Sequence, residues 1–139
     1  MSDLNNKGQS LVLFVVFIPF ILMIGTFIID VSYAKYNYNK LSNITKETLR
    51  YGLRNIENEP YEKMVNLLYK NEENLDEYKI DIKKEEKNIN IETLKSSKGI
   101  FGSIIGKKIY SQKISYTGFI ENDKIIIKKE QKWKNKQQR

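Results

Sequence analysis

The chain has 139 residues, of which 29% are charged, a net charge of +7, and no cysteine or histidine. This length leaves room for one folded domain besides an anchor. The missing residue types exclude disulfides, thiolate chemistry, the usual zinc sites and histidine acid–base catalysis. The sequence also lacks a nucleophile–base pair, a phosphate loop and metal-ligand spacing. We therefore predict a protein that is not an enzyme and that uses no metal and no cofactor.

An uncharged apolar run extends from Leu11 to Ile29, and 15 of its residues are Leu, Ile, Val or Phe. As a helix the run would be about 28 Å long, close to the ~30 Å hydrocarbon core of a bilayer. Those residues favour insertion by about 4–9 kcal/mol in total. We predict a transmembrane helix at residues 9–30, preceded by a leader or cytoplasmic tail at residues 1–8. A cleaved secretory signal is disfavoured, because this core is long and Asp30 precedes the candidate cleavage site.

Asp30 ends the apolar run, at a point where we expect its carboxylate to reach water. Small and apolar residues then recur at steps of three and four, and nothing breaks the pattern before Pro60. The pattern predicts that the helix continues as an extended stem over residues 31–57. One face of the stem would pack against other stems and would also cover the protein's own sheet. The residues predicted for stem packing are Ala34, Tyr38, Leu41, Ile44, Thr48 and Gly52.

Residues 58–133 are predicted to form a short helix and a small antiparallel sheet. Asn58 would cap the helix and Pro60 would lie in its first turn. The predicted buried face of this helix comprises Tyr61, Met64, Val65 and Leu68. Alternation of apolar and polar residues then predicts strands at residues 78–83, 88–94, 108–120 and 124–133, with a turn at 121–123. Because a sheet with one apolar face needs a cover, we predict an α+β fold in which the long helix packs on the sheet.

The C-terminal stretch is strongly basic, with seven cations against Glu130 alone from Lys124 onward. Such a stretch can bind nucleic acid, anionic lipid or an anionic cell-wall polymer, and a tryptophan can stack on single-stranded bases. A solvated tail at residues 134–139 that keeps the protein soluble is an equally good interpretation. The candidate residues for polyanion contact are Lys128, Lys129, Lys132, Trp133, Lys134, Lys136 and Arg139.

The segment KGQSLVLFVVFIPF, followed by Asp30, Tyr36, Leu41-Ser-Asn43 and Gly52, resembles TadE/TadG-like proteins of the tight-adherence (Flp) pilus system. The resemblance covers residues 7–53. It implies a pilin-like fold and a membrane-anchored, minor structural component of such a pilus or of a related secretion apparatus. It also implies a cytoplasmic N-terminus, an extracytoplasmic C-terminal domain, and pilin-like or pilus-assembly subunits and membrane lipid as partners.

The resemblance further implies that a prepilin peptidase is a partner that cuts between Gly8 and Gln9. The family has a glutamate at the fifth position after the cut, which is Leu13 in this chain. That carboxylate is thought to pair with a neighbour's terminal amine, where an unpaired charge is expensive. Since leucine lacks the charge, we predict a minor subunit and not the major, polymer-forming one.

A second hypothesis is a membrane-tethered extracytoplasmic binding module that uses the basic tail for DNA or a wall polymer. The cations after the apolar run do not decide the orientation, since long domains translocate regardless of charge. Lysine outnumbers arginine 21 to 3, and this bias is typical of an AT-rich genome such as that of a Gram-positive-like bacterium.

Overall fold

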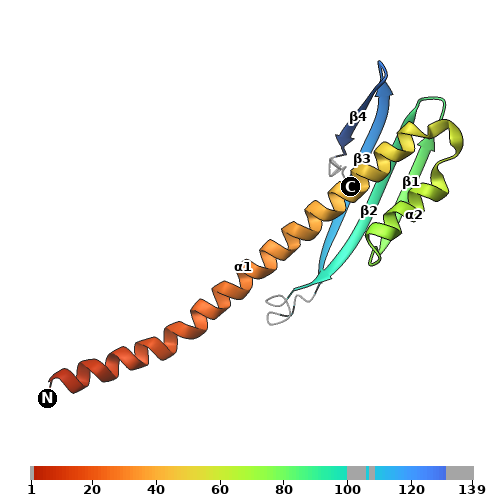
Figure 1. Cartoon of the computed structure of the whole chain (residues 1–139). Helices are drawn as coiled ribbons and strands as arrows, with labels where there is room; N and C mark the ends of the chain where they lie inside the picture. The colour runs from red at the N-terminus through yellow and green to blue at the C-terminus, as the bar shows by residue number, and fades with distance from the viewer. Residues whose placement is uncertain (1, 100–105, 107–108, 131–139) are drawn as a thin grey trace, which may run out of the picture. The chain divides into compact units, whose positions relative to one another are not determined.

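The computed structural model describes residues 2–99, 106 and 109–130. These residues form an α+β fold with one long N-terminal helix and a four-stranded antiparallel sheet (Figure 1). The elements are α1 (Ser2–Arg54), the 3-10 turn η1 (Ile56–Asn58), α2 (Tyr61–Asn71), β1 (Glu77–Lys83), β2 (Asn88–Lys98), β3 (Ile109–Glu121) and β4 (Lys124–Lys129).

Contacts divide the chain into two compact units. The anchor unit comprises Met1–Tyr36 and Ser97–Tyr110, and the head unit comprises Asn37–Ser96 and Ser111–Arg139.

Helix α1 is one uninterrupted element from Ser2 to Arg54, and Pro19 lies inside it. It therefore begins before the expected start at residue 9 and continues past Asp30, as the periodicity predicted. Proline removes one backbone donor from a helix interior. The apolar residues before and after Pro19 nevertheless remain helical.

The sheet of the head unit has the strand order β1-β2-β3-β4. Its two hairpins are antiparallel, with Ile80 opposite Ile91 and Ile120 opposite Ile125. Asn122 and Asp123 form the turn between β3 and β4, both with positive φ (51° and 59°). Positive φ at both central residues is the mark of a type I′ hairpin turn, and asparagine and aspartate tolerate it well. The turn predicted at residues 121–123 is thus confirmed.

The core of the head unit lies between the sheet and the two helices. Residues of α1 after Tyr36 and the whole of α2 lie over one face of the sheet (Figure 1). Alternate residues of β2 point into this core, in keeping with the twofold period of a strand. The fully buried apolar side chains are Leu41, Leu49, Leu53, Met64, Leu68, Ile89, Ile91 and Ile114.

The prediction for the start of α2 was wrong in two respects. Asn58 ends η1 and does not cap the helix; Pro60 takes the N-cap position, without a side-chain cap. Between them, Glu59 has a left-handed backbone (φ 49°) and redirects the chain. Pro60 is buried at this end of the helix, whereas Tyr61 is 47% exposed. Met64 and Leu68 form the buried face as predicted, and Val65 is half-buried.

The strand bounds also differ from those predicted. β2 extends to Lys98, four residues beyond the alternating segment, while β4 already ends at Lys129. Within β2 the inward positions continue through Thr93 and Lys95. Because these two inward residues are polar, alternation of apolar residues alone does not reveal that the strand continues.

At Gly52, α1 approaches the rest of the core closely. A Cβ at this position would meet the Sδ atom of Met64 and would stand 2.9 Å from Cδ1 of Ile89. We expect Gly52→Val to destabilise the head by about 1–3 kcal/mol, the usual cost of overpacking a core. Urea unfolding in detergent, followed by circular dichroism, measures this cost.

Gly25 provides the control, because nothing lies within 4 Å of its virtual Cβ. Gly25→Val should leave the unfolding midpoint of the head unchanged. An equal loss of stability in both variants would show that the close approach at Gly52 is not the cause.

Candidate functional site

The first functional feature is the apolar surface of α1 in the anchor unit. Every large apolar residue from Leu11 to Ile29 is between 45% and 70% exposed. Among the described residues, α1 is the single helix long and apolar enough to cross a membrane. A helix that is apolar all round requires an apolar environment. The chain therefore contains one candidate membrane anchor.

Asp30, at the end of the apolar run, is not placed as expected. Its side chain is only 6% exposed and does not reach water freely. Its Oδ2 atom lies 2.7 Å from the place where a Cβ of Gly99 would stand, and Tyr110 lies against the same glycine. The absence of a side chain at Gly99 thus makes room for the carboxylate, a long-range contact that the sequence did not indicate.

The residues predicted for stem packing have different environments. Leu41, Thr48 and Gly52 are buried in the head unit's own core, while Tyr38 and Ile44 are half-buried there. The part of the prediction in which this face covers the chain's own sheet is confirmed. Leu41 and Gly52, which are buried in this way and line none of the described hollows, offer no surface to another stem.

The exposed apolar residues of α1 outside the apolar run lie in the anchor unit. Val31, Tyr33 and Tyr36 are 52%, 51% and 62% exposed, and Ala34 is half-buried. The residues predicted for stem packing include Ala34 but neither Tyr33 nor Tyr36. Tyr33 and Tyr36 could have been chosen from the sequence, because both are large and lie off the buried stripe.

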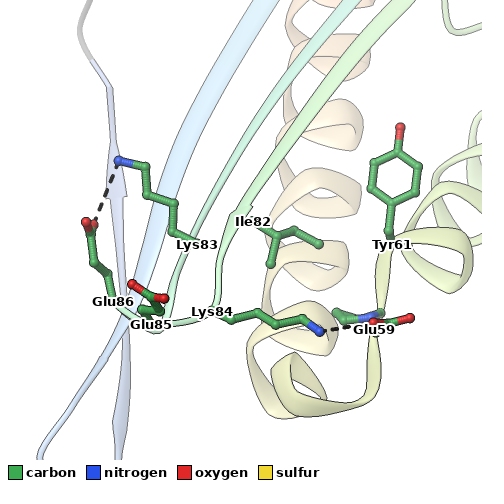
Figure 2. Close-up of a pocket in the computed structure, with 8 residues that line it drawn as sticks. Glu59, Tyr61, Ile82, Lys83, Lys84, Glu85 and Glu86 are labelled. Atoms are coloured by element: carbon green, nitrogen blue, oxygen red, sulfur yellow. Dashed lines mark hydrogen bonds and ion pairs between the residues drawn. The ribbon is translucent and has the colours of Figure 1, made fainter.

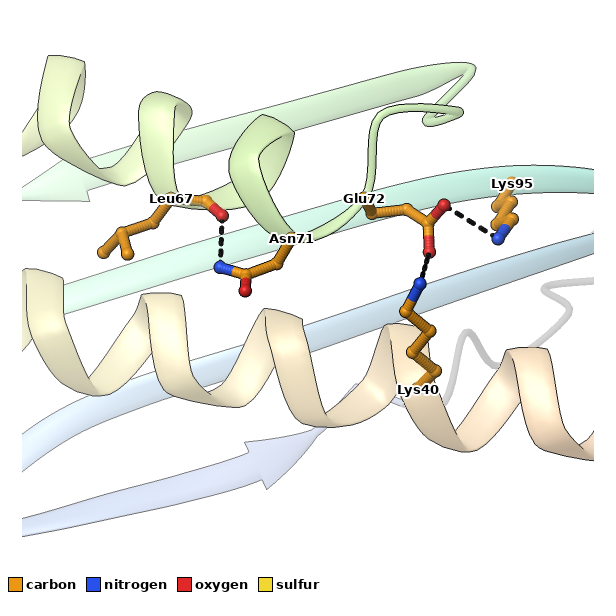
Figure 3. Close-up of polar contacts among 5 residues, drawn as sticks. All are labelled: Lys40, Leu67, Asn71, Glu72 and Lys95. Carbon is orange, nitrogen blue, oxygen red and sulfur yellow. Dashed lines mark hydrogen bonds and ion pairs between the residues drawn. The ribbon is translucent and has the colours of Figure 1, made fainter.

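An ion triad around a buried carboxylate connects three elements of the head unit (Figure 3). Glu72, the residue after α2, is almost fully buried and binds Lys95 of β2 at 2.8 Å and Lys40 of α1 at 3.2 Å. Burial by itself would raise the pKa of Glu72, but the hydrogen bonds and charges of the two lysines outweigh it, and the pKa is lowered. The triad therefore holds an ionised carboxylate between the helices and the sheet.

The residues predicted for prepilin processing are accessible. Gly8 and Gln9 are both exposed on α1, and no atom lies within 4 Å of the virtual Cβ of Gly8. Cleavage between them stays a prediction.

The basic residues predicted to contact a polyanion are not brought together where they can be described. Lys128 and Lys129 are adjacent in β4 and so point to opposite faces of the sheet. Lys128 lies over the ring of Phe119, at 5.1 Å from its centroid. Lys129 donates a hydrogen bond to the Tyr38 hydroxyl, which raises the pKa of Lys129. Lys132, Trp133, Lys134, Lys136 and Arg139 lie outside the described residues.

A hollow of about 730 Å³ lies between the β1–β2 turn and the start of α2 (Figure 2). Four of its five charged residues form pairs, Lys83 with Glu86 at 3.8 Å and Lys84 with Glu59 at 3.4 Å. Exposed pairs of this kind contribute about 0–1 kcal/mol. Within the described part of the chain, no group of three His, Cys, Asp or Glu residues could hold a metal ion.

Compared with protein-family models, with curated proteins and with solved structures, the chain matches none of them.

The anchor makes a direct prediction. Replacing both Ile21 and Ile24 with lysine should cost about 3 kcal/mol per residue at the centre of a bilayer, most of the free energy that favours insertion. We expect the double variant to leave the membrane fraction on alkaline carbonate extraction. The double variant Tyr33→Lys/Tyr36→Lys, with the same added charge beyond the apolar run, should stay in the membrane. If the Ile21/Ile24 variant also resists extraction, this segment is not the anchor.

The ion triad makes a second prediction. Glu72→Gln leaves two ammonium groups without their anion, and Lys95 is only 9% exposed. We expect a loss of about 3–5 kcal/mol in the free energy of unfolding at neutral pH, as for other broken buried pairs. Urea unfolding in detergent measures it, with the exposed neighbouring change Glu73→Gln as the control.

The difference in unfolding free energy between the wild type and Glu72→Gln should depend on pH in a definite direction. Because the folded-state pKa of Glu72 is lowered from 4.5, its contribution is fully present above the unfolded pKa and disappears as the pH falls through the folded one. The stability gap between the wild type and Glu72→Gln should therefore narrow below about pH 4.5. A gap that stays constant down to pH 2 would contradict this role of the carboxylate.

Proposed function

We propose that the protein is a membrane-anchored, minor pilin-like subunit, similar to TadE/TadG-like proteins, of a tight-adherence-type pilus or a related secretion apparatus. One observation carries the proposal: a single helix, α1, supplies both an exposed apolar segment and the central core element of a head with a small antiparallel sheet. The segment that resembles the family, residues 7–53, coincides almost completely with this helix.

In this role the protein acts structurally. The apolar segment lies in lipid or against other apolar helices, and the exposed residues Val31, Tyr33 and Tyr36 provide the first contact surface beyond it. Leu13 is 60% exposed and carries no charge, so it offers no ion pair to a neighbouring subunit. A subunit without that pair fits a filament tip, a sparse position in the filament or an assembly factor better than a repeating position in a polymer.

No described residue favours the alternative binding module. Its two described cations, Lys128 and Lys129, lie on opposite faces of β4. DNA or wall-polymer binding through the basic tail stays a prediction.

Photo-crosslinking in the native membrane tests the proposal. A crosslinkable amino acid at Tyr33 or Tyr36 should form adducts with other small subunits that have an N-terminal apolar helix, identified by mass spectrometry. The same probe at Asp123, at the tip of the β3–β4 turn, is the control for non-specific capture. Adducts with lipid alone, in cells that assemble the machine, would contradict the subunit role.

The mass of the same membrane-extracted protein reports on processing. A chain that starts at Gln9 supports peptidase cleavage after Gly8, whereas a chain that starts at Met1 or Ser2 supports an uncleaved, permanently anchored assembly factor. Both results are compatible with the proposed subunit role and distinguish its two forms. A start near Lys35 would show a removed secretory signal and would contradict the role.

A further inference from the structure

A groove lies between α1 and α2. It consists of two adjoining hollows of about 240 Å³ and 280 Å³ that share Tyr51 of α1 and Leu67 of α2. We refer to it as the interhelical groove. Ile44 extends its apolar floor, and all three side chains are half-buried. The groove belongs entirely to the head unit.

The rim of the interhelical groove is basic. Arg50 and Arg54 line it from α1, and Lys63 and Lys70 line it from α2. Glu47 is the one acid among its lining residues, and it already pairs with Arg50. Among the described residues, no ion pair or hydrogen bond engages the side chains of the other three cations. The rim thus keeps a surplus of positive charge beside an apolar floor.

A buried hydroxyl provides an independent indication of a ligand. Thr48 lines the groove and is only 1% exposed. Its Oγ1 atom has no hydrogen-bond partner in the described structure. A buried polar group without a partner costs about 1–3 kcal/mol, and such groups in native proteins call for an explanation. The neighbouring threonine of the same helix, Thr45, is fully bonded, to Leu41 and Thr93.

We infer that the interhelical groove binds an acidic peptide segment of another protein that carries an apolar side chain. The apolar side chain occupies the floor formed by Ile44, Tyr51 and Leu67, and its flanking carboxylates face Arg54, Lys63 and Lys70. The Thr48 hydroxyl donates to a carbonyl or carboxylate oxygen of the segment. Charge complementarity selects the acidic partner, and the apolar floor selects a peptide over a simple anion.

This inference does not rest on the proposed pilus role, because a head with any anchor would bind through the same groove. The test uses the full chain in nanodiscs of neutral lipid. The probe is a short fluorescein-labelled peptide in which glutamates flank each leucine, and its counterpart has lysines in place of the glutamates. Fluorescence polarisation should show at least about tenfold tighter binding of the acidic peptide, decreasing as salt rises.

Charge reversal locates the site. Arg54→Glu/Lys63→Glu should weaken binding of the acidic peptide at least about tenfold. The matched variant Lys79→Glu/Lys124→Glu makes the same change of net charge on exposed strand residues outside the groove, and it should change affinity less than about twofold. Equal losses in the two double variants, or equal binding of the acidic and basic peptides, would overturn the inference.

Thr48→Val separates a ligand contact from a merely structural role. Removing an unpartnered buried hydroxyl should leave the melting temperature unchanged or raise it. If the hydroxyl donates to the ligand, the same variant binds the acidic peptide several-fold more weakly. Unchanged affinity would overturn the assignment of Thr48. Displacement of the peptide by anionic phosphatidylglycerol vesicles, with a fixed amount of protein, would identify a lipid headgroup as the occupant and overturn the peptide partner.

Discussion

The apolar surface of residues 11–29 is the constraint on which the rest of the molecule depends. The large apolar residues of this run are at least 45% exposed in the chain alone, and water strongly disfavours so much contiguous apolar surface. The same helix later contributes Leu41, Leu49 and Leu53 to the core of the head. The backbone hydrogen bonds of α1 continue without a break. The segment suited to a membrane and the segment that folds with the head therefore belong to one continuous helix.

The head is specified by polar contacts as well as by apolar packing. Ser42 bonds the Tyr116 hydroxyl at 2.6 Å, and Thr45 bonds Thr93 at 3.0 Å, both in the buried layer between α1 and the sheet. A helix that slid along the sheet by one turn would lose both bonds and leave their groups unsatisfied. The ion triad at Glu72 acts in the same way, since a buried carboxylate that loses its lysine partners is costly.

The sequence predicted the features that depend on local periodicity. The long helix, the two hairpins and the Asn122–Asp123 turn follow from steps of three and four, from alternation and from turn chemistry. The environments of Asp30 and Glu72 could not be predicted, because their neighbours, such as Gly99 and Lys95, are distant in sequence. The sequence could have predicted that Lys128 and Lys129 point to opposite faces of the sheet, since adjacent strand residues face opposite ways.

The composition of the apolar run limits how subunits could associate within lipid. Helices in a bilayer associate through small residues and polar side chains, and between Leu11 and Ile29 the chain offers only Gly25 and Thr26. Because residue 13 is a leucine and not a carboxylate, it adds no ion pair to the association of these helices. In the proposed subunit role, specific association would then come mainly from surfaces outside the lipid. The exposed tyrosines of the anchor unit and the interhelical groove of the head are the described surfaces whose chemistry suits that task.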